Sequence, residues 1–300
     1  MTLRPSDTLQ IIPNKRDELI FDNLDDLHEQ INGLGYYGGI RLVKASLKKF
    51  VDYCELHNII LPKESFSIAY QSNIPIRLGL AGSSAIITAV LKAVFQFYNI
   101  TITKPHFANL ILSVEEEELN IAAGLQDRVA QAYEEPVFMN FDKEIMEAQS
   151  YGNYEPIAAS LFPNFYIAYR TEMAEGSEVV HSNLKERFAQ GDSKVVNAMQ
   201  DFAQLTQDAF ENLKNKKPER LGELMDQNFD LRHSICDIAS QNLEMVNLAR
   251  SVGASAKFTG SGGAIIGTYK NEEMYQNLTM LLQENNIQIL KPKIVTLNES

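Results

Sequence analysis

The residues best suited to chemistry are a pair of acids and a loop rich in glycine and serine. Glu116 lies in a run of four consecutive glutamates, and Asp127 follows it within the segment 124–131. The loop, residues 75–85, has the sequence PIRLGLAGSSA. Carboxylates hold divalent cations or accept protons, and a glycine-rich turn that opens a helix binds anions through its free backbone N–H groups. We therefore predict the phosphate loop of a kinase in this chain.

The loop can bind phosphate in this way only between a strand and a helix. Residues 66–70 alternate apolar and polar side chains like a half-buried strand, and residues 85–98 run apolar without Gly or Pro, as in a helix. We expect Gly79 and Gly82 to take positive φ angles and the two serines to bring hydroxyls to the helix start. A simple helix cap is the alternative interpretation. The residues predicted to bind phosphate are Gly79, Leu80, Ala81, Gly82, Ser83, Ser84 and Ala85.

The glutamate run also has two interpretations. Adjacent acidic side chains usually form a solvated helix face. Because four helical positions cover more than a full turn, however, at least one of these side chains must point inward, where a carboxylate needs a cation or a donor. We expect a helix from Pro105 to about Leu119 to carry the run, and a second helix over 126–133 to carry Asp127.

Composition and charge exclude several classes of function. The chain has 300 residues, 45% of them hydrophobic, which suffices for two domains with packed cores. Its net charge is −12 without basic blocks, so we expect neither a nucleic-acid partner nor an anionic membrane surface. We find no apolar run of membrane length and expect a cytoplasmic protein. Cys54 and Cys236 are expected to be reduced structural thiols.

A second glycine-rich stretch lies near the C-terminus. Its three glycines precede an apolar strand within residues 256–267, a pattern that alone indicates a tight bend or a bulge. The polar stretch 142–155 marks the expected boundary between an N-terminal domain, 1–153, and a C-terminal domain, 154–300. We also expect strands over 8–13, 164–170 and 287–295, and helices over 23–32, 40–56, 176–188, 192–214, 218–240 and 271–284.

In their types and order, these motifs resemble those of the GHMP small-molecule kinases. The phosphate loop of that family reads Pro-x-x-x-Gly-Leu-Gly/Ala-x-Ser-Ser-Ala, and its third motif, Lys-x-Thr-Gly-x-Gly-Gly, matches residues 257–263. The resemblance implies an α+β fold of two domains, the first with the phosphate loop and the second rich in helices and carrying the glycine motif. It also implies ATP and Mg²⁺ as cofactors and a small molecule as acceptor.

The resemblance implies roles for individual residues as well. In the family, a glutamate that holds Mg²⁺ precedes the catalytic aspartate, which implies metal binding by Glu116 with Ser84 and proton acceptance by Asp127. Arg128, beside this aspartate, is the second residue that we expect to be catalytic. The glycine motif, which shapes the nucleotide and acceptor pockets in the family, comprises Thr259, Gly260, Ser261, Gly262 and Gly263.

Five segments look like those of glucuronokinases, the GHMP kinases that phosphorylate the anomeric hydroxyl of glucuronic acid. They are residues 36–42, 79–86, 123–131, 180–182 and 228–232. The carboxylate of such a sugar calls for an arginine, and Arg128, Arg41 and Arg232 are the candidates in that order, each also suited to a structural ion pair. Another acceptor, such as an aldose, a heptose phosphate or mevalonate, and a non-catalytic sugar or nucleotide binder stay open, as does a homodimer.

One part of the family pattern has no counterpart in the sequence. The first GHMP motif, on an N-terminal strand, normally precedes the point at which this sequence begins. Without it, we expect a neighbouring strand to keep unpaired backbone groups. We also expect a version extended upstream to gain stability and kinase activity.

Overall fold

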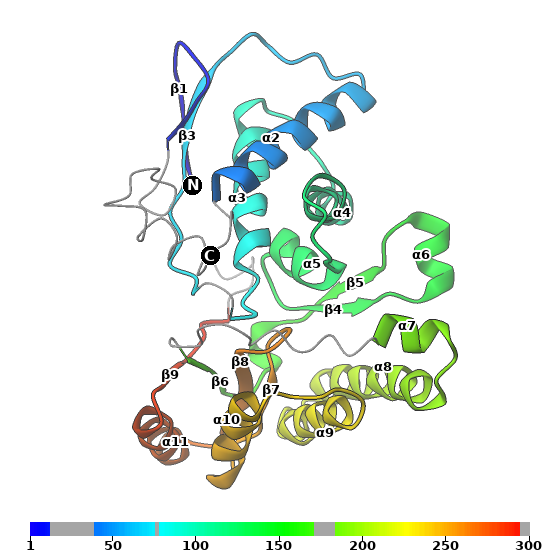
Figure 1. The fold of residues 1–300 in the computed structure, drawn as a ribbon, viewed down its shortest axis with the longest axis vertical. Coiled ribbons are helices and arrows are strands. Elements are labelled where there is room, and N and C mark those ends of the chain that lie inside the picture. The colour runs from blue at the N-terminus through cyan, green and yellow to red at the C-terminus, as the bar shows by residue number, and fades with distance from the viewer. Residues whose placement is uncertain (13–38, 76–77, 171–183, 295–300) are drawn as a thin grey trace, which may run out of the picture. The chain divides into compact units, whose positions relative to one another are not determined.

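The computed structural model describes residues 1–12, 39–75, 78–170 and 184–294. They form two units (Figure 1). The first contains Met1–Ile74 and Ala81–Pro156, and the second contains Pro75–Leu80 and Ile157–Val295. The predicted phosphate loop is therefore divided between the two units after Leu80.

The first unit contains a sheet of three strands in the order β1-β3-β2. The central strand is β3 (Phe66–Ala69), as predicted; it pairs antiparallel with β1 (Thr2–Pro5) and parallel with β2 (Gln10–Ile12). Phe66 and Ile68 are its buried positions, as period-two alternation requires. β3, the strand before the phosphate loop, thus has partners on both edges, whereas β1 and β2 are the edge strands of the described sheet.

Four helices share one apolar core with this sheet: α2 (Gly39–Leu56), α3 (Gly82–Phe97), α4 (Lys104–Ser113) and α5 (Leu125–Tyr133). α2 packs against α3, and α4 packs against α5 (Figure 1). Phe50 of α2 meets Phe95 of α3 edge to face, with ring centroids 5.1 Å apart. The predicted helix 40–56 is confirmed as α2.

The stretch 142–155, expected to be a polar boundary, has regular structure. It holds α6 (Lys143–Gln149) and β5 (Asn153–Pro156), and β5 pairs antiparallel with β4 (Val137–Asn140), so that α6 lies at the end of a hairpin (Figure 1). Asp142 begins the helix by accepting a hydrogen bond from the backbone N–H of Glu144 at 2.9 Å. The predicted boundary between residues 153 and 154 lies inside β5.

The second unit is built on an antiparallel sheet in the order β7-β8-β6-β9. Its strands are β6 (Phe165–Arg170), β7 (Lys257–Phe258), β8 (Ala264–Thr268) and β9 (Ile287–Leu290), preceded by a 3₁₀ turn, Ala159–Leu161. The predicted strand 164–170 is confirmed, whereas the predicted strand 287–295 ends early, at Leu290. Buried side chains such as Tyr166, Ile265 and Leu278 form the core of this unit.

Five helices complete the second unit: α7 (Leu184–Ala189), α8 (Ser193–Lys214), α9 (Arg220–Ile235), α10 (Ser240–Ser251) and α11 (Glu272–Glu284). α8 and α9 run side by side (Figure 1). The predicted helix 218–240 was too long, because Cys236 takes an extended conformation with φ −126° and ψ 144°, and α10 was not predicted. Among the helices that the structure describes, none has the length and apolar character that a membrane span requires.

Several sequence predictions lie wholly or partly outside the described residues. The helix 23–32 and the segment 180–182 lie outside them, as do residues 36–38 of the segment 36–42 and residues 76–77 of the phosphate loop. Of the helix 176–188, the part from Leu184 onward is described, as α7.

The close approach of β8 to the loop before β7 leads to a stability prediction. A Cβ atom added at Gly267 would lie 1.7 Å from the carbonyl oxygen of Ser255. Gly267→Ala must therefore push two backbone segments apart within the sheet, and we expect it to lower the free energy of unfolding by about 3 kcal/mol or more. Urea denaturation measures this loss. The matched control is Gly124→Ala, where an added Cβ meets no atom within 4 Å; equal losses in the two variants would contradict the prediction.

Candidate active site

The N-terminal end of α3 presents a group of free backbone donors. The first helical hydrogen bond runs from the N–H of Ala85 to the carbonyl of Ala81, at 3.1 Å. The three preceding N–H groups, those of Gly82, Ser83 and Ser84, donate to no acceptor in the described part of the chain. Such groups, together with the positive end of the helix dipole, attract phosphate.

The turn that exposes these groups differs from the predicted one. Gly79 has the expected positive φ of 63°, but Gly82 is already helical and Ala81 holds the left-handed conformation, with φ 53°. α3 therefore begins three residues before the predicted start at Ala85. A left-handed alanine costs about 1–2 kcal/mol, which the surrounding contacts must offset.

Ser84 is part of a buried network and does not cap the helix. Its side chain lies inside the first turn of α3 with 1% of the residue exposed. Its hydroxyl donates to the carbonyl of Ala81 at 3.0 Å and accepts a hydrogen bond from the side-chain amide of Gln131 at 2.9 Å. Neither serine caps the helix, because Ala81 is the capping residue and has no side-chain bond to α3, so the alternative interpretation of a simple helix cap does not hold.

Gln131 links α5 to the start of α3 through side-chain hydrogen bonds. Its Nε2 also donates to the Ala81 carbonyl at 3.2 Å, and its Oε1 accepts a hydrogen bond from Thr88 at 2.9 Å. Sequence reasoning gave no role to this residue. The available signal was its position four residues after Asp127, which places both side chains on one face of a helix.

Asp127 lies in the first turn of α5, where the helix dipole favours a negative charge. Its side chain is 45% exposed, and one Oδ accepts a hydrogen bond from Arg128 Nη1 at 3.3 Å. This carboxylate is therefore open to a ligand and held by one neighbouring cation. Because α5 carries both Asp127 and Gln131, the contact of Gln131 with Ser84 links the orientation of the helix to the free N–H groups of α3.

The inward-pointing glutamate is Glu115, whereas the sequence prediction paired Glu116 with Asp127. Glu115 is 2% exposed and forms a buried ion pair with Arg128, whose Nε donates to it at 2.6 Å. Arg128 Nη1 also donates to the Gly124 carbonyl at 3.0 Å. Burial raises the pKa of Glu115, and Arg128 opposes this shift. Arg128 therefore contacts Glu115 through one edge of its guanidinium and Asp127 through Nη1.

A π-helical segment, Val114–Glu118, decides how the glutamates point. The predicted α-helix to Leu119 therefore ends as α4 at Ser113, and the wider turn moves Glu115 to the buried side. Glu117 and Glu118 pair with Lys49 at 2.5 Å and Lys48 at 2.6 Å. Glu116 is exposed, and its carboxylate forms no ion pair or hydrogen bond with the described residues.

The glycine motif packs against the first residues of the phosphate loop within the second unit. Thr259 donates from its hydroxyl to the Gly79 carbonyl at 3.1 Å. A Cβ atom added at Gly79 would lie 2.6 Å from the carbonyl oxygen of Gly262, so the two turns meet backbone to backbone. Gly262 and Gly263 have φ angles of 140° and 81°, which only glycine adopts readily.

The other two arginine candidates also have structural contacts. Arg41 donates to the carbonyl of Leu119 at 3.0 Å. Arg232 donates to the carbonyls of Gly260 at 2.9 Å and Ser261 at 3.3 Å, and thus supports the glycine motif. Ser261 itself is exposed.

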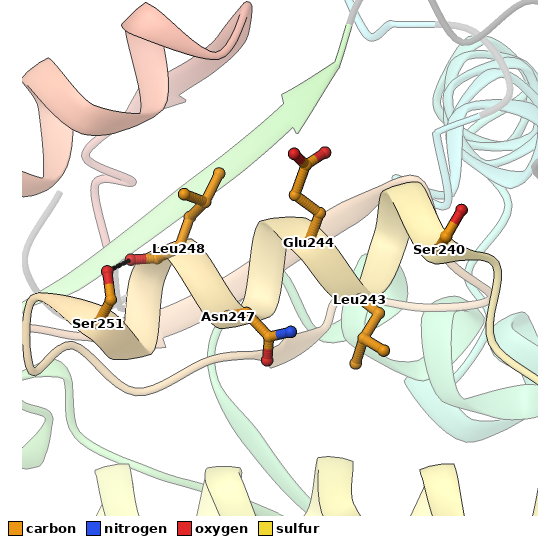
Figure 2. A pocket seen from close by; sticks show the side chains of 6 residues that line it. All are labelled: Ser240, Leu243, Glu244, Asn247, Leu248 and Ser251. Atoms are coloured by element: carbon orange, nitrogen blue, oxygen red, sulfur yellow. Dashed lines mark hydrogen bonds between the residues drawn. The ribbon is translucent and has the colours of Figure 1, made fainter.

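A separate shallow hollow of about 340 Å³ lies along α10 in the second unit (Figure 2). The side chains that line it come from Ser240, Leu243, Glu244, Asn247, Leu248 and Ser251. Its one carboxylate, that of Glu244, is paired with Arg170 of β6 at 2.5 Å. None of the predicted site residues lines this hollow.

Comparison with known proteins shows a family match and similar curated proteins. The family model "GHMP kinases N terminal domain" matches residues 41–135. The chain is 42% identical to glucuronokinase 1 of Arabidopsis thaliana over 270 residues, which cover 88% of this chain and 74% of that protein. It is 26% identical to mevalonate kinase of Methanocaldococcus jannaschii over 313 residues, which cover 98% of this chain and 92% of that protein.

The fold is similar to that of a solved kinase structure. Phosphomevalonate kinase of Streptococcus pneumoniae, in complex with phosphomevalonate and AMPPNP, matches with a TM-score of 0.69 and 15% identity, covering 98% of this chain and 89% of that one. This likeness concerns the fold alone, and it confirms the predicted α+β fold class.

Proposed function

This chain belongs to the GHMP kinase family, and we propose that it transfers the γ-phosphoryl group of ATP to the anomeric hydroxyl of glucuronate or a related sugar acid. The family resemblance predicted from the sequence is thereby confirmed, as is the expectation of a small-molecule kinase. The 42% identity to glucuronokinase 1 supports a sugar as the acceptor. That the acceptor is a sugar acid, and that its anomeric hydroxyl is phosphorylated, is what we propose.

The observation that carries the proposal is the set of free N–H groups at the start of α3. Three consecutive donors lacking acceptors, at the positive end of a 16-residue helix, suit the oxygens of a nucleotide phosphate. Gln131 holds the turn in place through Ser84 and Ala81, so the donors are preorganised. Phosphoryl transfer needs such alignment and charge neutralisation more than it needs covalent chemistry from the protein.

Asp127 is the proposed proton acceptor. Its half-exposed carboxylate can reach a bound hydroxyl, and Arg128, itself locked on Glu115, limits its movement. An anomeric hydroxyl is more acidic than an ordinary alcohol, so Asp127 acts as much by orienting the hydroxyl as by taking its proton.

We propose Ser84 and Glu116 as the protein ligands of Mg²⁺, which the proposed use of ATP calls for. Ser84 donates one hydrogen bond and accepts one, which leaves an oxygen lone pair, and the exposed Glu116 offers a carboxylate. The described residues hold no group of three or more His, Cys, Asp or Glu side chains suited to a metal. Mg²⁺ keeps several waters and phosphate oxygens as ligands, so one or two protein oxygens are enough. The ion would neutralise phosphate charge there.

An acceptor panel tests the proposal. Glucuronate, galacturonate, glucose and mevalonate are offered with ATP, and formation of ADP is followed. We expect the highest kcat/KM for glucuronate or galacturonate, and a product whose ³¹P NMR signal couples to the anomeric proton.

The matched control is the methyl glycoside of the preferred sugar acid, which lacks a free anomeric hydroxyl and must not react. Phosphorylation of the glycoside would place the product at another position. A preference for mevalonate would point to a different acceptor class, and binding of ATP and sugar without turnover would point to a non-catalytic binder.

A further inference from the structure

Two cations lie beside the glycine motif in the second unit. Lys257, the first residue of β7, is half-buried, and its Nζ donates to the Phe258 carbonyl at 3.0 Å. Arg232 of α9 stacks over the Phe258 ring, with its Cζ 5.2 Å from the ring centroid. The two side chains are close enough for the charge of Arg232 to act on Lys257.

Among the described residues, no carboxylate is paired with either charge. Arg170, Arg187 and Arg250 of the same unit, by contrast, form ion pairs with Glu244, Asp192 and Asp226. Burial, with a smaller contribution from Arg232, lowers the pKa of Lys257 to about 8, and burial also lowers the pKa of Arg232. Two neighbouring cations without a counter-charge are unfavourable in a protein that binds no anion there.

The adjacent loop adds backbone donors. The N–H groups of Ser261 and Gly262 donate to no acceptor in the described part of the chain, although Gly262 is buried. Arg232 donates hydrogen bonds to the carbonyls of Gly260 and Ser261 in this loop. Successive N–H groups without acceptors in a turn with positive φ angles form an anion-binding concavity.

We propose that Lys257, Arg232 and the N–H groups of Ser261 and Gly262 bind the carboxylate of the acidic sugar. The inference rests on the proposed function for the identity of the acceptor. The reaction involves two anions, and the nucleotide phosphates already have the free donors of α3. Of the three arginines considered for the carboxylate, Arg128 is held by a buried glutamate, and the positive charge of Arg232 is reinforced by Lys257.

The pair makes acceptor binding depend on pH. Arg232 from α9 is the charged group that faces Lys257, and the Cys236 thiol lies near Arg232. Lys257 attracts a carboxylate only when protonated, and with a pKa of about 8 it loses its proton as the pH rises through that value. The KM for the sugar acid should therefore rise above pH 8, while the KM for a neutral sugar should not.

Steady-state kinetics of the full chain test the proposal with three variants. Lys257→Ala is expected to raise the KM for glucuronate by about tenfold or more, with the KM values for glucose and ATP unchanged. Lys257→Arg should retain the wild-type KM near neutral pH and lose the alkaline rise. Lys270→Ala, a change at an exposed lysine of the same unit, should behave as wild type.

An equal rise for glucuronate and glucose, or a rise confined to ATP, would overturn the proposal. Calorimetric titration with glucuronate separates it from the proposed function. If the wild type binds glucuronate without phosphorylating it, and Lys257→Ala abolishes this binding, the carboxylate site stands although the proposed function fails. Binding that Lys257→Ala leaves unchanged overturns the carboxylate site itself.

Discussion

Asp127→Asn is expected to lower kcat by about 10²-fold or more while preserving the fold and the affinity for ATP. Asparagine keeps the size of the side chain and can still meet Arg128, but it cannot accept the proton of the sugar hydroxyl. The side chain is 45% exposed, so its replacement leaves no buried polar group unpaired. Turnover with the preferred sugar acid and calorimetric titration with ATP measure the two effects separately.

Glu134→Gln is the matched control for this variant. Glu134 caps the other end of α5 and pairs with Lys92 at 2.5 Å, and its side chain is 57% exposed. The same carboxylate-to-amide change at this position should leave kcat unchanged. If Asp127→Asn also turned over at the wild-type rate, the proton would have another acceptor and Asp127 would lose its proposed role.

Breaking the Glu115–Arg128 pair is expected to have the largest effect on stability. Arg128→Met leaves the Glu115 carboxylate buried without a partner, which should lower the free energy of unfolding by about 3–5 kcal/mol. The double variant Glu115→Leu/Arg128→Met removes both charges and should recover most of the loss. Urea denaturation of both variants and the wild type gives these values.

A surface pair provides the comparison for this measurement. Lys49→Met removes the partner of Glu117, whose side chain is 65% exposed, and should cost less than about 1 kcal/mol. A double variant as unstable as Arg128→Met would show that the lost stability comes from packing and not from an unpaired charge. We expect kcat of the double variant to stay low, because Asp127 has lost the cation that positions it.

Elements with a strong periodic pattern were predictable from the sequence. The long helices α2 and α8 show apolar positions at helical spacing, and β3 alternates buried and half-buried residues. β1 was missed because its strand state depends on pairing with β3 and its own residues are mostly exposed. α10 was not predicted; its buried face, formed by Met245, Val246 and Ala249, also contains the polar Asn242.

The kind of chemistry was determined by the sequence alone. Glycines and serines before an apolar helix predict an anion site whichever residue caps the helix, because the free N–H groups belong to the backbone. In the tertiary structure, the residue with the left-handed conformation is Ala81, whereas the sequence predicted Gly82. The π-helical turn, which was not predicted, buries Glu115 and leaves Glu116 exposed.

Only the tertiary structure decided which charged groups already have partners. Arg128 meets Glu115 across 13 positions of the chain, and Gln131 meets Ser84 across 47. No local pattern encodes such contacts, since they depend on how α3, the π-helical segment Val114–Glu118 and α5 pack around a shared core. In the second unit, packing places Lys257 beside Arg232, and neither side chain forms an ion pair with a described residue. The sequence could not show this, because a lysine in a glycine motif looks the same whether its partner is an acid of the chain or the anion of a substrate.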